Sequence, residues 1–236
     1  GALPAIDGSA LTGLASGGVD TQLTATSNIG LGTGSVDSIT SGDHNIGLGD
    51  NSGTAITTGS DNVAIGSSAL KANDSGSYNV AIGKEAMYWN TIGGANVAIG
   101  RESMFRNTFG SDNTALGYAA LGSNTEGYSN VGLGKRAGNA VTTGYHNILI
   151  GHGAGDAITT GYHNTIIGDG PGTATMNETL AIYTGTSERL KVDSTGLTIN
   201  GAALPVAPTM RFADKAAESS NEFYFKFTSN ATIAGM

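Results

Sequence analysis

Three histidines have the residue type and spacing that come closest to a metal site. His44, His146 and His163 each stand immediately before an asparagine, and the last two are seventeen residues apart. Imidazole nitrogens are common ligands of zinc and copper. The last two also belong to the motif GYHN, which is typical of a polar turn. We interpret this column as a turn, with a metal site at His146 and His163 as the alternative, and we expect no cofactor.

Two glutamates have the spacing of a repeated site. Glu85 and Glu102 are seventeen residues apart, and each follows a cation, Lys84 or Arg101. Paired carboxylates are the machinery of glycoside hydrolysis. Their position in a repeat predicts a solvated charge ladder instead, and the chain contains no phosphate loop, zinc signature or nucleophile elbow. The sequence therefore predicts a protein that is not an enzyme.

Aromatic residues gather in the middle of a chain that contains only 6% of them. They are Tyr78, Tyr88, Trp89, Phe105 and Phe109. Aromatic faces stack on other rings, including those of sugars, so we predict a receptor-binding cluster here. The alternative is that these side chains fill a corner or a groove between subunits. A second column, Tyr128, Tyr145 and Tyr162, is either an outward stripe or part of a turn.

The elements that position these residues follow from one asparagine that recurs every seventeen residues. Each asparagine opens a pentad of the form N-x-x-x-G, such as NVAIG from Asn62 to Gly66. A fixed period of this kind indicates stacked units that bury their apolar residues against their neighbours. Identical units place each asparagine about 4.8 Å above its equivalent, which predicts an amide ladder. Its members are Asn28, Asn45, Asn62, Asn79, Asn96, Asn113, Asn130, Asn147 and Asn164.

Each pentad predicts a short strand that is apolar on both faces. Val63 and Ile65 point to one side and Ala64 to the other, because side chains alternate along a strand. A strand of this type is buried on both faces. One coil has too few large apolar residues to cover both faces, so we expect a second chain to cover one of them. We expect the small column of Ala64 to face the neighbouring subunits, where it would let their backbones approach closely.

A column of glycines predicts the corner of each coil, three residues before each asparagine. We expect a positive φ there, which glycine adopts at little cost. Its members are Gly42, Gly59, Gly76, Gly93, Gly110, Gly127, Gly144 and Gly161.

Composition excludes several partners. The 236 residues include 38 glycines and no cysteine, and the net charge is −8. Lysine and arginine form no cluster, so we expect no nucleic-acid binding. The apolar runs are only a few residues long, so we expect no membrane insertion. We divide the chain into a linker segment (1–24), the repeat rod (25–170), post-repeat strands (171–205) and a C-terminal tip or cap (206–236).

The array resembles the glycine-rich repeats of bacteriophage tail fibres. The resemblance rests on NTALGYAALGSNTEG from Asn113 to Gly127, and on the flanking segments LPAIDGSALTGLA and SERLKVDSTGLTINGAAL. It implies a structural and receptor-binding component of a virion tail fibre. Such a component is extracellular, binds a glycan or protein of the host surface and contacts other tail or baseplate proteins. A tailspike that degrades polysaccharide is the enzymatic alternative.

The strand motif N-x-[VI]-A-I-G is also similar to the heads of trimeric autotransporter adhesins, which are parallel β-rolls in homotrimers. This bacterial adhesin is the second alternative. We prefer the fibre because the chain shows neither heptads nor a membrane anchor. The subunit count of three comes from these resemblances. The sequence thus predicts an elongated all-β array, with parallel coils of seventeen residues in an interlocked homotrimer.

Overall fold

The computed structural model of the protein describes residues 27–199, which form a parallel β-solenoid without a helix. The predicted all-β array of seventeen-residue coils is confirmed. No helix of these residues is long and apolar enough to cross a membrane. The segments 1–24 and 206–236, predicted as linker and as tip or cap, lie outside the described residues.

Nine strands of three residues each mark the coils. They are β1 (Ile29–Leu31), β2 (Ile46–Leu48), β3 (Val63–Ile65), β4 (Val80–Ile82), β5 (Val97–Ile99), β6 (Thr114–Leu116), β7 (Val131–Leu133), β8 (Ile148–Ile150) and β9 (Thr165–Ile167). Longer strands follow: β10 (Leu180–Thr184), β11 (Ser187–Asp193) and β12 (Gly196–Ile199). All twelve lie in one sheet in sequence order.

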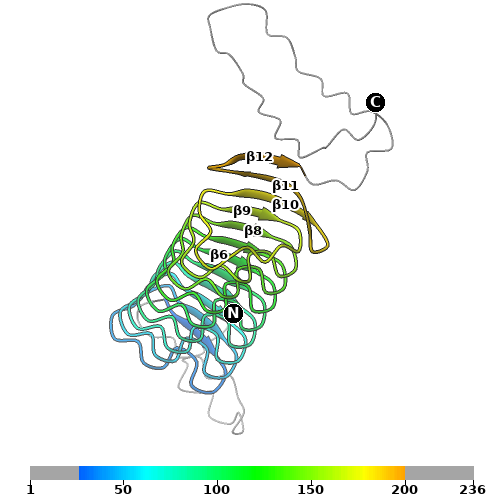
Figure 1. Cartoon of the computed structure of the whole chain (residues 1–236). Coiled ribbons are helices and arrows are strands. Elements are labelled where there is room, and N and C mark those ends of the chain that lie inside the picture. The colour runs from blue at the N-terminus through cyan, green and yellow to red at the C-terminus, as the bar shows by residue number, and fades with distance from the viewer. Residues whose placement is uncertain (1–26, 200–236) are drawn as a thin grey trace, which may run out of the picture. The chain divides into compact units, whose positions relative to one another are not determined.

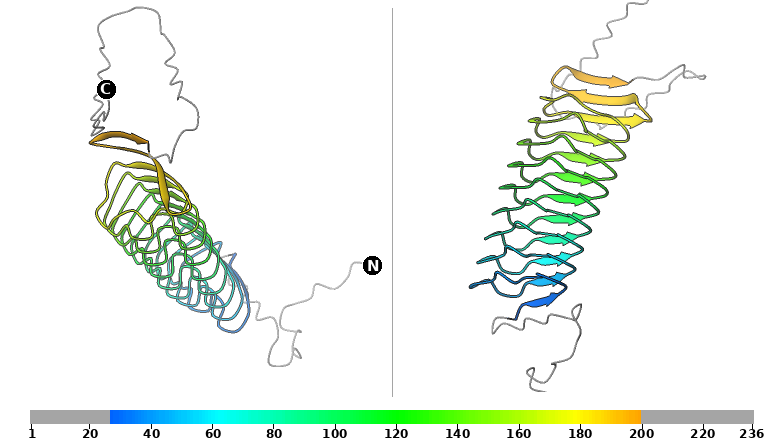
Figure 2. Two further views of the ribbon diagram at one scale, coloured as in Figure 1. Left: turned by 45° about the vertical axis from the view of Figure 1, so that its right-hand side comes forward. Right: turned by 90° about the horizontal axis from the view of Figure 1, so that it is seen from below.

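The first ten strands are stacked in parallel, one coil above the next (Figure 1). Ala64 pairs with Ala81 and Ala81 with Ala98, and the same register holds in every coil up to β9. Because the units have equal length, each strand meets its neighbour without a shift. The views in Figure 2 show the strands forming one side of the stack, with loops closing each coil on the other.

The sheet changes character after β10. β10 pairs in parallel with β9, and β11 and β12 then fold back as antiparallel strands. The register shifts between Ile182 and Tyr183, because Arg189 of β11 has no pairing partner in β10. These strands fall within the segment 171–205, and they extend the sheet beyond the last coil.

The core lies inside each coil, and the small column of the strands faces it. Ala64, Ala81, Ala98 and Ala115 are fully buried. Larger side chains reach them from six residues further along the same coils, namely Leu70, Met87, Met104 and Leu121. The prediction that the small column faces a neighbouring subunit is therefore wrong. The small residues are needed because these large side chains fill the same narrow space from the opposite wall.

In the C-terminal coils the large core side chain comes from the strand, and the facing wall carries glycine. Leu149 and Ile166 take the place of alanine in β8 and β9, and the residues six positions later are Gly155 and Gly172. A Cβ built on Gly155 would lie 2.6 Å from Leu149 Cδ2. Each of these coils accommodates one large residue, from either the strand or the facing wall, because protein interiors are close-packed.

The outer face of the sheet carries the larger apolar residues. Val63 and Ile65 are half-buried, and Ile29, Leu116 and Ile148 are 44%, 43% and 42% exposed. The same face continues through Leu180, Val192, Leu197 and Ile199, all of which are exposed. We call the outward residues of β1–β12 the outer sheet face.

The nine predicted asparagines form a continuous buried ladder. In each step Nδ2 donates to Oδ1 of the preceding asparagine at 2.9–3.1 Å. The same Nδ2 of Asn96 donates to the Gly110 carbonyl, and Asn96 Oδ1 accepts from the backbone N–H of Asn113. Every rung therefore joins neighbouring coils and also ties the corner of its own coil to the strand.

A second asparagine ladder was missed by the sequence analysis. Asn73, Asn90, Asn107 and Asn124 are buried and are also seventeen residues apart. Nδ2 of each of the last three donates to Oδ1 of the preceding asparagine at 2.6 Å. The signal was present as a second periodic asparagine within the same units. The ladder ends at Val141, which leaves Asn124 Oδ1 buried without a hydrogen-bond partner among the described residues.

The corner glycines have a different cause from the one predicted. None of the column from Gly42 to Gly161 has a positive φ. A Cβ on Gly110 would instead lie less than 3.0 Å from the carbonyl oxygen of Gly127 in the next coil, and the other corner glycines are similarly close to the coil above them. The positive φ falls on the residue before each ladder asparagine, such as Tyr78, Ala95 and Asp112, and on the pentad glycines.

Candidate functional site

Three of the five predicted aromatic residues form a cluster on the outside of the central coils. The Tyr88 and Phe105 rings are stacked with centroids 5.3 Å apart and planes at 25°. Trp89 meets Tyr88 edge-on at 4.9 Å, and Lys71 Nζ lies 5.3 Å from the Tyr88 centroid. Lys71, Tyr88 and Phe105 are one repeat apart, so the stacking of coils brings them together at the strand spacing.

The other two aromatic residues lie apart from this cluster. Tyr78 is 67% exposed and Phe109 is 54% exposed. Within residues 27–199 neither makes a ring contact with Tyr88, Trp89 or Phe105. Tyr78 occupies the column immediately before the ladder asparagines, and Phe109 lies near the glycine corner. The ring contacts therefore join three of the five predicted residues.

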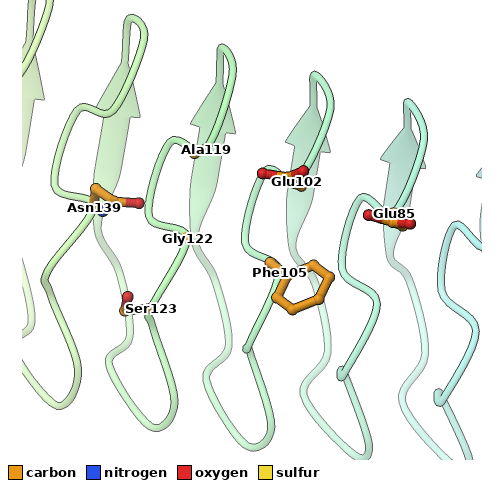
Figure 3. A pocket seen from close by; sticks show the side chains of 7 residues that line it. All are labelled: Glu85, Glu102, Phe105, Ala119, Gly122, Ser123 and Asn139. Carbon is orange, nitrogen blue, oxygen red and sulfur yellow. The ribbon is translucent and has the colours of Figure 1, made fainter.

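A pocket opens where the aromatic stack ends (Figure 3). Its volume is about 190 Å³. Its lining residues are Glu85, Glu102, Phe105, Ala119, Gly122, Ser123 and Asn139. The next position in the column after Phe105 is Gly122, which has no side chain to continue the stack. The pocket thus lies where this column of the repeat has no side chain.

The two predicted glutamates lie on the rim of this pocket, in neighbouring coils. Glu85 pairs with Lys84 at 3.7 Å, and Glu102 Oε1 accepts from Arg101 at 3.0 Å. The adjacent Glu102 carboxylate is the main cause that raises the pKa of Arg101, whose guanidinium also lies 5.1 Å from the Tyr118 ring. The glutamates thus form a ladder of ion pairs, and the pocket rim carries hydrogen-bond acceptors.

The histidine column forms a ring cluster. His146 and His163 meet edge-to-face with centroids 5.0 Å apart. They adjoin a stack of Tyr128, Tyr145 and Tyr162, whose rings are 4.9 and 5.1 Å apart and nearly parallel. His44 lies instead between Asp43 and Asp61. In the described part of the chain, no three His, Cys, Asp or Glu residues are grouped so that they could hold a metal ion.

Four pocket residues were not predicted from the sequence, namely Ala119, Gly122, Ser123 and Asn139. The available signal was an interruption in a column. Reading every seventeenth residue from Lys71 gives Lys71, Tyr88, Phe105, Gly122 and Asn139, in which an aromatic pair is followed by a glycine. A glycine of this kind is noticed only when the residues at equivalent positions of successive coils are compared.

Comparison with protein-family models, curated proteins and solved structures found no match for this chain. The class of protein therefore follows from the fold, which is that of a β-solenoid repeat protein.

Proposed function

We propose that this chain forms the rod of a phage or phage-like tail fibre, in which three copies associate through the outer sheet face. The observation that supports this assembly is that face itself. From β1 to β12 it spans eleven strand spacings of about 4.8 Å, or about 53 Å. Its outward residues are valine, isoleucine and leucine with few exceptions. Extended apolar surfaces on soluble proteins mark interaction sites.

The rod would serve attachment, with its exposed aromatic pocket available to a glycan or protein of the host surface. The ladders and interlocked corners make each coil depend on its neighbours, which suits a stiff projecting element. Other tail or baseplate proteins would hold the fibre on an extracellular virion. Nucleic acid is an unsuitable partner because the chain carries a net charge of −8.

The head of a bacterial trimeric adhesin is the second candidate, because the outer sheet face would serve either assembly. A polysaccharide-degrading tailspike receives less support from the pocket. The two carboxyl groups of a glycosidase flank the scissile bond, whereas Glu85 and Glu102 each form an ion pair with the cation that precedes it. We therefore propose binding without catalysis. Release of reducing ends from a host polysaccharide would replace this proposal with the tailspike.

The assembly is tested by the mass of the purified chain in light scattering. We expect three times the mass of one chain. Ile99→Lys places a charge in the centre of the outer sheet face and should give single chains, because a buried unpaired charge is costly. Thr143→Lys adds the same charge at an exposed position away from the sheet and should leave the mass unchanged. A monomeric mass for the unmodified chain would overturn the trimer.

Attachment is tested separately, by flow cytometry of bacterial strains incubated with the fluorescently labelled chain. We expect stable labelling of some strains, which excess unlabelled chain removes. Labelling of none of the strains would contradict the attachment role while leaving the assembly result unaffected.

A further inference from the structure

The pocket beside Phe105, which we call the slot, lies at the end of a stack of three side chains. Lys71, Tyr88 and Phe105 occupy three successive rungs, and each covers the next. Figure 3 shows the Phe105 ring on the side of its coil that is turned away from Gly122, and Gly122 contributes no side chain to the pocket. The Phe105 ring is half-buried and lines the pocket, so part of its surface is open to an incoming group.

The slot has the dimensions of one ring. Phe105 and Asn139 are two coils apart, which corresponds to about 9.6 Å at the usual strand spacing. Gly122 lies one coil from Phe105, about 4.8 Å along the axis, so a ring bound at this level is close enough to contact the Phe105 ring. The pocket volume of about 190 Å³ is smaller than the roughly 300–1,000 Å³ typical of sites for larger ligands. A single ring is the largest group that it would enclose.

The rim of the slot is polar. A Cβ built on Gly122 would lie 2.7 Å from Asn139 Oδ1, so this amide oxygen lies directly beside the glycine. Ser123 adds a hydroxyl, and Glu102 adds a carboxylate whose Oε1 already accepts from Arg101. A wholly apolar ring would remove these groups from water without satisfying them, which is costly. The best ligand has an apolar face and hydroxyls around its edge.

We propose that this slot binds one neutral hexopyranose ring, stacked on Phe105 with its hydroxyls toward Glu102, Ser123 and Asn139. The carboxylates of Glu85 and Glu102 on the rim disfavour acidic sugars through like-charge repulsion. The inference rests on the proposed attachment function, for which it names the ligand class and the site. None of the lining residues belongs to a strand, so assembly through the outer sheet face leaves the slot open.

The test is saturation-transfer NMR on the full chain with three probes, the methyl glycosides of glucose, galactose and mannose. Benzyl alcohol serves as an aromatic comparator. We expect saturable binding of at least one glycoside, with transfer strongest to protons on one face of the sugar ring, and weaker binding of benzyl alcohol. Phe105→Ala removes the stacking surface and should lower the affinity at least tenfold.

A second variant fills the slot without removing Phe105. Gly122→Phe adds the missing ring, and its nearest obstacle is the end of the flexible Asn139 side chain. This variant should abolish binding while the circular dichroism spectrum is unchanged. Phe109→Ala removes an exposed phenylalanine of the same coil outside the pocket, so its affinity should stay within twofold of the unmodified chain.

The inference is overturned if no glycoside binds, if benzyl alcohol binds more tightly, or if binding survives Gly122→Phe. Cell labelling by the same variants separates these results from the proposed function. Labelling that persists in Gly122→Phe keeps the attachment role and moves its site elsewhere on the chain, whereas a chain that labels no cells removes the role itself.

Discussion

Replacing Asn96 with alanine should destabilise the solenoid more than any exposed substitution. The Asn96 side chain takes part in four hydrogen bonds. Its Nδ2 donates to Asn79 Oδ1 and to the Gly110 carbonyl, and its Oδ1 accepts from the backbone N–H and from Nδ2 of Asn113. All four bonds are lost in Asn96→Ala, at a position that is fully buried.

The magnitude depends on which groups keep another partner. Gly110 O still accepts from Asn107 Nδ2. Asn79 Oδ1 and Asn113 Nδ2 likewise retain one bond each. The three bonds made by these groups should cost about 0.5–1.5 kcal/mol each. The backbone N–H of Asn113 loses its partner inside the protein, which costs about 1–3 kcal/mol more. We expect a total loss of about 2.5–7.5 kcal/mol.

The assay is the free energy of unfolding from urea titrations followed by circular dichroism. All variants are compared at one protein concentration, because assembly would make the midpoint depend on concentration. Asp112→Asn lies at the exposed position immediately before Asn113, in the next coil. It keeps a residue that tolerates a positive φ and should change stability by less than about 0.5 kcal/mol. A loss below about 1 kcal/mol for Asn96→Ala would refute the argument that the ladder holds the coils together.

Two further predictions concern the core. Leu149→Ala should lower the free energy of unfolding by about 3–5 kcal/mol, and Gly155→Leu alone should also destabilise the protein because its Cβ meets Leu149. The double variant recreates the alanine–leucine pairing of the central coils, so a double-mutant cycle should show a favourable coupling of at least about 2 kcal/mol. Purely additive losses would contradict the idea that either wall can supply the large side chain. Val141→Thr places a hydroxyl beside Asn124 Oδ1, which has no hydrogen-bond partner among the described residues, and should be neutral or stabilising in thermal unfolding. Val36→Thr, which is also buried but lies in another column, should destabilise the protein by about 1–3 kcal/mol. Equal losses of stability at both positions would show that Asn124 Oδ1 accepts no hydrogen bond from the new hydroxyl.

The candidate site was only partly predictable from the sequence. The crowding of Tyr88, Trp89 and Phe105 was visible, because these residues are unusual in a chain so poor in aromatics. Their pocket was not, since it is formed by the absence of a side chain at Gly122 and by the lean of Asn139 over that glycine. Tyr78 and Phe109 are close to these residues in sequence, but within residues 27–199 neither ring contacts the cluster.

The repeat period by itself determined the parallel register and the ladder from Asn28 to Asn164, because units of equal length have one way to stack with every equivalent residue aligned. The tertiary structure alone decided which face of each strand is internal. Alternation divides Val63 and Ile65 from Ala64 but does not say which side the loop covers. That choice depends on Leu70, Met87 and their equivalents, which fill the coil from the opposite wall and leave room only for small residues beneath the strand.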